Sequence, residues 1–248
     1  MAQLFAPAAN AWFRLGLVSL LIGGMVIVTG LLAFARSSYN TSQNYVPDQP
    51  IPFSHEHHVA DCGIDCRYCH TSVTKEARAG MPSTETCLRC HRYLFADSEM
   101  LRPIHDSWRN QEPLRWNRVH DLPDFVYFNH SIHINKGIGC YSCHGRVDRM
   151  PLIEQAAPLT MQWCLDCHRN PEAHVRPKSL IFETRPLAEL IAATPPQDSE
   201  DKYPQQELNL AEQASNDADV ASSLQSVRHQ LAEEYAVESY TDCYTCHR

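Results

Sequence analysis

The sequence predicts a protein of short α-helices and irregular loops with little β structure, from three observations. A C-x-x-C-H pattern occurs five times in 248 residues, at 66–70, 87–91, 140–144, 164–168 and 243–247. This pattern is the attachment signature of c-type haem. The motifs leave about 36 residues each, too few for an ordinary hydrophobic core. An N-terminal apolar stretch is long enough to span a bilayer. We therefore predict a multihaem cytochrome c (class III-like), built around its porphyrins, with one N-terminal transmembrane helix.

Each motif would supply two thiols that join a haem covalently and one histidine that binds its iron. A zinc ribbon or a disulfide framework would not place a histidine after every cysteine pair. We therefore predict five covalently bound haem c groups. Cys62, the one cysteine outside the motifs, is expected to be a small buried residue. The attachment cysteines are Cys66, Cys69, Cys87, Cys90, Cys140, Cys143, Cys164, Cys167, Cys243 and Cys246, and the motif histidines are His70, His91, His144, His168 and His247.

Residues 1–36 predict a transmembrane anchor. The run Leu15–Ala35 holds no charged side chain, and about 20 apolar residues span a bilayer as a helix. A cleaved signal peptide is the alternative, but its apolar region is usually only about 7–15 residues long. Arg14 and Arg36 flank the run evenly, so orientation follows from haem attachment, which takes place on the periplasmic side. We expect a single-pass protein of the bacterial inner (cytoplasmic) membrane, with a cytoplasmic N-terminus and a periplasmic haem domain.

Three further segments follow the anchor. Residues 37–52, rich in Ser, Asn, Gln and Pro, predict a linker. Residues 53–182 predict a tetrahaem core of two dihaem repeats, and residues 183–248 an acidic C-terminal extension that carries the fifth haem. Within this extension, residues 195–204 predict a loop. Residues 205–239 lack Gly and Pro and show apolar side chains at helical spacing, which predicts an amphipathic helix.

The predicted core is an internal duplication. Its first unit begins with Phe53-Ser-His55-Glu-His57-His58 and its second with Phe128-Asn-His130-Ser-Ile-His133, an F-x-H-x-x-H pattern in both. In each unit this pattern precedes a motif, a Met-Pro pair and a second motif that is followed by Arg. Each unit therefore offers two attachment motifs and two further histidines.

Five irons have ten axial positions, so five ligands are needed beyond the motif histidines. The repeats supply four candidates, His55, His58, His130 and His133. For the fifth we expect His120, which has no counterpart in the first unit. His174 is the alternative, followed by Met81 or Met161. The remaining histidines, expected to be surface or structural residues, are His57, His105 and His229.

The charge argues against nucleic-acid binding. The net charge is −8, and each haem would add two propionates. Residues 183–240 hold twelve Asp or Glu against three Lys or Arg. Such a segment is typical of a solvated surface, and the alternative is an acidic docking face for a basic periplasmic partner.

Several motifs resemble the ActA subunits of alternative complex III. They are GIDCRYCH, MPSTETCLRCH, RVHDLPDFVYFNHSIH, GCYSCHGRVDRMP and MQWCLDCHRNPE, between residues 50 and 177. The resemblance implies a membrane-anchored pentahaem electron-transfer subunit of a quinol-oxidising complex. The implied partners are NrfD-like polytopic quinol-binding subunits, an iron–sulfur subunit, a monohaem cytochrome c subunit and a soluble periplasmic acceptor. It also supports the ligand role of His55, His58, His120, His130 and His133, whereas Cys62 has no match in the family pattern.

Other functions fit less well. A multihaem reductase would need an open iron, often on a C-x-x-C-K motif, and no such motif occurs. If histidines close every iron, no substrate site remains, so we predict no catalytic residues and no enzyme activity of the chain's own. A NapC-like membrane-anchored quinol dehydrogenase shares the single anchor, but nothing beyond the motifs suggests a quinone pocket. A freestanding electron shuttle is the last alternative.

Overall fold

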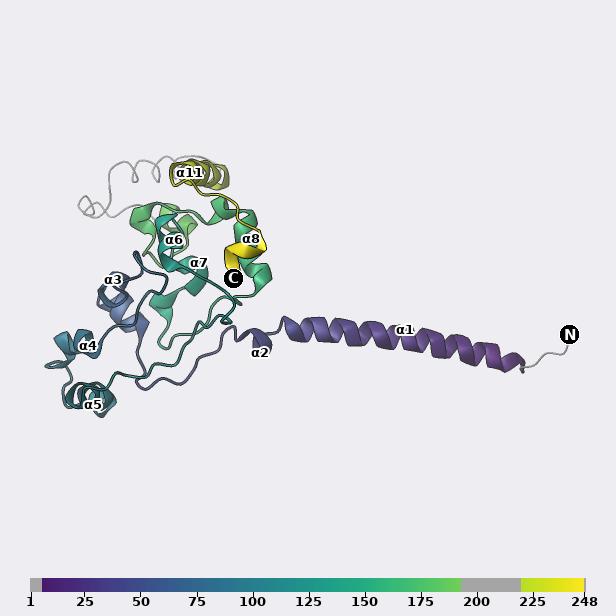
Figure 1. Ribbon diagram of the computed structural model, residues 1–248, viewed down its shortest axis with the longest axis horizontal. Coiled ribbons are helices and arrows are strands. Elements are labelled where there is room, and N and C mark those ends of the chain that lie inside the picture. Colours follow the sequence, from purple (N-terminus) through teal and green to yellow (C-terminus); the bar gives the residue numbers. More distant parts are fainter. Residues whose placement is uncertain (1–5, 193–219, 248) are drawn as a thin grey trace. The chain divides into compact units, whose positions relative to one another are not determined.

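The computed structural model describes residues 6–192 and 220–247 (Figure 1). The contacts within the chain divide it into two compact units, Met1–Gln43 and Asn44–Arg248. The four-part division expected from the sequence stays a prediction. The expected loop at 195–204 lies outside the described residues.

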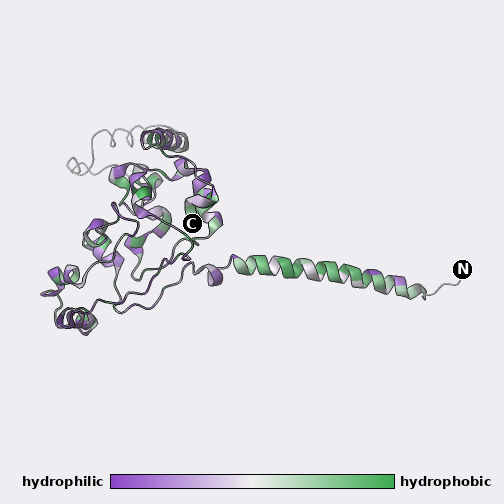
Figure 2. Ribbon diagram, in the orientation of Figure 1, coloured by the Kyte–Doolittle hydropathy of each residue, from purple (hydrophilic) through white to green (hydrophobic). Residues whose placement is uncertain are grey.

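The first unit is dominated by one long apolar helix, α1 (Pro7–Ala35), followed by the short α2 (Ser38–Thr41). The helix begins eight residues before the charge-free run because Pro7 suits a first helical turn, where its missing N–H is not needed. Figure 2 shows apolar residues along most of its length. Inside the helix, the Thr29 hydroxyl donates to the Met25 carbonyl at 2.9 Å, so its polar group is satisfied locally. By length and composition α1 is able to cross a membrane.

The second unit is built from short helices joined by irregular segments. Its described residues hold no β-strand, only isolated bridges between Val126 and His247 and between Ile138 and Val175. The α-helices are α3 (Cys66–Cys69), α4 (Thr84–His91), α5 (Arg102–Asn110), α6 (His130–Asn135), α7 (Tyr141–His144), α8 (Met161–Arg169), α9 (Leu187–Ala192), α11 (Val220–Glu234) and α12 (Cys243–Cys246). Single turns of 3-10 helix lie at Glu99–Leu101, Val147–Arg149, Pro171–His174 and Lys178–Leu180, and a π-helical turn at Glu56–Asp61.

Each motif forms one helical turn or the end of a short helix. Three of these helices begin with a side-chain cap, in which an oxygen accepts a backbone N–H of the first turn. The caps are Asp65 before α3, Thr160 before α8 and Asp242 before α12. A helical turn brings both cysteines and the following histidine of a motif to one side, as attachment to a single haem requires.

Most of the apolar residues that the second unit buries form four small clusters. The one around α11 contains Val227, Leu231 and Tyr235, which lie at helical spacing and pack on Ile138 and Val175. Of the segment predicted as an amphipathic helix, 205–239, the structure describes a helix at Val220–Glu234, and residues 205–219 lie outside the described residues. Small separate clusters agree with the expectation that such a thin chain cannot build one ordinary core.

Candidate haem-binding site

The two repeats place their Phe and His side chains in the same way. The Phe53 ring lies edge-on to His55 at 4.9 Å between centroids, and Phe128 lies edge-on to His130 at 4.7 Å. In each repeat, the same Phe also packs on the second histidine, with centroids 4.3 Å apart and an interplanar angle of 26° for His58, and 4.5 Å and 30° for His133. The duplication seen in the sequence is therefore also a duplication of side-chain geometry.

The second histidine of each pair faces the second motif of its own unit. His58 and His91 have ring centroids 6.1 Å apart, and so do His133 and His168. An iron bound on both sides by imidazole nitrogens, at about 2 Å each, would separate the ring centres by about 6 Å. Both pairs have the spacing that two axial ligands of one iron require.

The first histidine of each pair lies near the first motif of its unit. His130 faces His144 at 6.4 Å between centroids, with the rings within 9° of parallel. In the other repeat, burial and then the neighbouring His70 lower the pKa of His55 to about 4. Burial likewise lowers the pKa of His144 to about 3. Neutral imidazole is the form that binds metal, so these shifts favour iron binding at neutral pH.

Backbone carbonyls orient most of these rings. When the Nδ1–H group of a neutral histidine donates to a carbonyl, Nε2 of the same ring is unprotonated and available to iron. His58 and His133 donate to the carbonyl four residues earlier, at Ser54 and Asn129, both at 2.8 Å. Five other rings point Nδ1 at a carbonyl between 2.8 and 3.3 Å away: His70 at Gly80, His91 at Leu94, His130 at Ala77, His168 at Tyr240 and His247 at Phe125.

His144 has a different Nδ1 partner. Its Nδ1 lies 3.2 Å from Nε2 of His120, and the two rings meet edge to face at 4.3 Å. Burial, and then His130, lower the pKa of His120 to about 4. The structure thus places His120, the residue without a counterpart in the first unit, beside the third motif. Its role as distal ligand of the fifth iron stays a prediction, and the hydrogen bond to His144 occupies its Nε2.

The fifth motif is attached to the second repeat. The Tyr127 N–H donates to the Cys246 carbonyl at 2.8 Å, and the Phe125 ring stacks on His247 at 5.8 Å. The Ser239 hydroxyl donates to the His168 carbonyl at 2.7 Å. The chain end is therefore held next to the F-x-H-x-x-H segment and the fourth motif.

Cysteines of different motifs lie close together. The Cys66 and Cys140 thiols interact closely enough to lower the pKa of Cys66 and raise that of Cys140, so the first and third motifs adjoin. Burial, and then Cys167 and Cys164, raise the pKa of Cys143 to about 12, which places the third motif beside the fourth. Burial, and then the neighbouring Cys69, raise the pKa of Cys87. Burial, and then the neighbouring Cys246, raise the pKa of Cys164.

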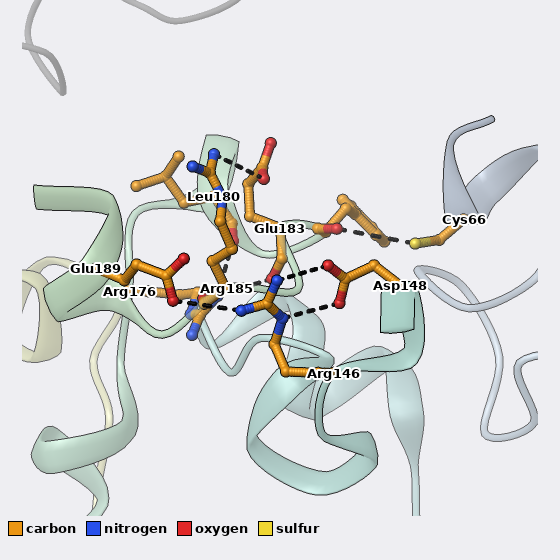
Figure 3. Close-up of polar contacts among 9 residues, drawn as sticks. Cys66, Arg146, Asp148, Arg176, Leu180, Glu183, Arg185 and Glu189 are labelled. Atoms are coloured by element: carbon orange, nitrogen blue, oxygen red, sulfur yellow. Dashed lines mark hydrogen bonds and ion pairs between the residues drawn. The ribbon is translucent and has the colours of Figure 1, made fainter. Parts of the chain in front are cut away.

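A network of charged residues holds the segment around residues 180–189 against the third motif (Figure 3). Arg146 binds Asp148 at 2.7 Å and Glu189 at 3.3 Å. Arg176 is 4% exposed, and its Nη1 donates to the carbonyls of Leu180, Glu183 and Arg185 between 3.0 and 3.4 Å. Sequence reasoning missed this network, because its acceptors are largely backbone carbonyls and carry no side-chain signal.

The residues outside the expected ligand set lie as follows. Cys62, expected to be buried, is exposed, and its Sγ lies 3.8 Å from Nε2 of His57. His57 is exposed, with Nδ1 3.1 Å from Asp61. His229 is also exposed and pairs with Glu172 at 3.3 Å. The other residues weighed as ligands or spare histidines are Met81, Met161 and His174, which are exposed, and His105, whose Nε2 is buried without a hydrogen-bond partner.

Comparisons with known proteins agree with this picture. No family model matches the chain. The chain is 34% identical over 140 residues to the menaquinone reductase, multiheme cytochrome c subunit of Nitratidesulfovibrio vulgaris. The aligned region is 56% of this chain and 60% of that relative, so the chain spans less than two thirds of the relative's length.

The relative, the motifs and the helical, strand-poor fold confirm the predicted fold class of a multihaem cytochrome c. The residues also fit covalently bound haem c on the structure alone. The paired imidazole rings have the separation that two axial ligands of one iron require, and their Nδ1 atoms face carbonyls. The two cysteines before each motif histidine form no disulfide.

The paired rings make a direct prediction for His58. His58→Ala removes the ring that faces His91, so one iron should lose an axial ligand and become high-spin. The measurement is the low-temperature EPR spectrum of the oxidised protein, in which one haem per chain should move to the high-spin region. His57→Ala is the matched control, since His57 is adjacent in sequence but exposed, and it should leave the spectrum unchanged. A His58→Ala spectrum identical to wild type would contradict the pairing.

Proposed function

We propose that this chain is a pentahaem electron-transfer subunit of a quinol-oxidising membrane complex of the alternative complex III type, passing electrons toward a periplasmic acceptor. The observation that carries the proposal is the set of facing histidines. Where imidazoles occupy both axial positions, no position remains for a substrate, and the haem supplies one-electron transfer. The chain then has no catalytic residues of its own.

The proposed sites are five. The first site consists of Cys66 and Cys69 with His70 and His55. The second site has His91 and His58 as axial ligands. The third site has His144 and His130. The fourth combines His168 with His133. The fifth uses Cys243 and Cys246 with His247, and its distal ligand is His120 by prediction, with His174, Met81 or Met161 as alternatives. The support is the ring spacing for the second, third and fourth sites, and the proximity of His55 to His70 for the first.

The motifs are proposed to form a single row in the order second, first, third, fourth, fifth. The electrostatic interactions between cysteines of adjoining motifs support each step: Cys87 with Cys69, Cys66 with Cys140, Cys143 with Cys164 and Cys167, and Cys164 with Cys246. In Figure 1, α4, α3, α7 and α8 follow one another across the second unit, with the C-terminal turn next to α8. The chain order and the spatial order differ because the first motifs of the two repeats meet in the middle.

The membrane setting belongs to the same proposal. The apolar helix α1 would anchor the chain in the bacterial inner membrane, with the N-terminus cytoplasmic and the second unit periplasmic. The proposed partners are NrfD-like polytopic quinol-binding subunits, an iron–sulfur subunit and a monohaem cytochrome c subunit. Support for a membrane complex comes from the relative, which is itself named as a subunit of a menaquinone reductase.

A second candidate differs in direction. The relative's name describes a complex that reduces menaquinone. This chain would then carry electrons from a periplasmic donor to the quinone pool. The histidine pairs serve both directions equally, because axial ligation closes the iron whichever way the electron travels.

Direction is tested in membranes that contain the whole complex. We expect a menaquinol analogue to reduce the haems of this chain, seen as growth of the reduced α-band, and a periplasmic acceptor to reoxidise them. The difference between this sample and a matched one with the Cys243→Ser and Cys246→Ser double variant isolates the signal of the fifth haem of this chain. Haems that resist quinol, but are reduced by a periplasmic donor and reoxidised by menaquinone, would establish the second candidate instead.

The row makes its own prediction. Removing an end site, with Cys243→Ser and Cys246→Ser, should shift the midpoint potential of one remaining haem, since an end site has one neighbour. Removing the central third site, with Cys140→Ser and Cys143→Ser, should shift two. Potentiometric titration measures both, after a haem assay confirms four haems per chain. The Cys87→Ser and Cys90→Ser variant removes the other end and should again shift one. Two shifted potentials after loss of either end site would contradict the order.

A further inference from the structure

Two arginines border one apolar cluster of the second unit, the cluster of Ile138, Val175, Val227, Leu231 and Tyr235. Arg176 directly follows Val175, and Arg228 directly follows Val227. Because Val175 and Val227 pack in the same cluster, the two arginine backbones lie on neighbouring segments. The packing of α11 against the turn Pro171–His174 confirms this closeness.

Arg228 has an unsatisfied donor in this position. Its Nε is buried and has no hydrogen-bond partner. A buried donor without a partner is costly, and more so when it is charged. Nη1 of Arg176, in contrast, donates to three backbone carbonyls, which fix that guanidinium in place without neutralising it (Figure 3).

The electrostatics of the pair point the same way. Burial lowers the pKa of Arg228. Burial also lowers the pKa of Arg176, and repulsion from Arg228 lowers it further, against the opposing effect of Cys140. Two like charges that burial already disfavours are stabilised by an anion between or beside them.

Two described carboxylates near the pair each bind another side chain. Glu172, on the turn that packs against α11, pairs with His229 at 3.3 Å. Glu183, whose carbonyl accepts from Arg176, pairs its side chain with Arg185 at 3.6 Å, and its charge also acts to raise the pKa of Arg176. A further source of carboxylate follows from the attachment motifs, because every haem carries two propionates.

We propose that Arg228 binds a haem propionate through its unpaired Nε–H, with Arg176 supplying a second positive charge. The haem belongs to the third or fourth motif. Arg176 interacts with Cys140 of the third motif, and the turn Pro171–His174 packs against α8, which carries the fourth. This inference rests on the proposed function, since it requires haem to be attached to the second repeat.

The test compares Arg228→Met and Arg228→Lys in the full-length holoprotein. A nearby cation stabilises reduced haem over oxidised haem, because reduction removes one positive charge from the iron. Arg228→Met should therefore lower one of the midpoint potentials, and Arg228→Lys should restore most of the loss. Resonance Raman spectra should show a changed propionate bending mode in Arg228→Met only. Gln230→Met, on an exposed position of the same helix, is the control and should change neither readout.

The outcomes separate this inference from the proposed function. A haem assay comes first, and a wild-type chain without covalent haem would overturn both. Five attached haems with all potentials and the propionate mode unchanged in Arg228→Met would overturn the propionate site alone. A wild-type potential that follows the phosphate concentration, with an unchanged propionate mode in the variant, would mean that a free anion occupies the site, and would also overturn it.

Discussion

The rest of the structure depends on pairs of imidazole rings at the separation that two axial ligands of one iron require. This spacing, about 6 Å between ring centres, is met by three histidine pairs contributed by separate parts of the chain. Side chains on short helical turns are not held at such spacing by helix geometry alone. In five of these six rings a hydrogen bond from Nδ1 to a backbone carbonyl fixes the ring's rotation and its tautomer together, and in His144 the partner is His120. The backbone between the motifs therefore acts as a set of acceptors that aims the rings.

The second unit contains little regular secondary structure. Its motif helices are mostly single turns, and its apolar residues form separate small clusters. The two repeats also support one another directly. The Glu56 N–H of the first repeat donates to the Met150 carbonyl of the second, and the His130 N–H of the second donates to the Ala77 carbonyl of the first. The F-x-H-x-x-H segment of each repeat is thus hydrogen-bonded to the other repeat, and these contacts bring the first and third motifs together.

Much of the site could be predicted from the sequence, because its chemistry repeats in the sequence. The Phe and His positions of the first repeat predict those of the second, and both adopt the same ring geometry. The partners of Nδ1 could not be predicted, since any residue has a backbone carbonyl. Gly80 is a partial exception. Its φ of +79° marks a turn that glycine favours, and its carbonyl accepts from His70.

Three other features depend on tertiary contacts that the sequence does not show. The sequence distinguishes His120 because it lacks a counterpart in the first repeat, but its contact with His144 depends on how a long connecting segment folds back. The sequence predicts a buried Cys62, yet this residue lies exposed beside His57. The unpaired Nε of Arg228 could be recognised only once burial was known. Sequence periodicity did predict the helix that positions it.

The most direct test of this account is a low-temperature EPR spectrum of the oxidised, purified protein, with the haem content measured on the same sample. Facing histidines at every iron predict five haems per chain and only low-spin signals. A high-spin signal equal to one haem per chain would show an iron with an open position. That result would contradict the closed ligation on which the electron-transfer proposal rests and would point to substrate chemistry at that iron.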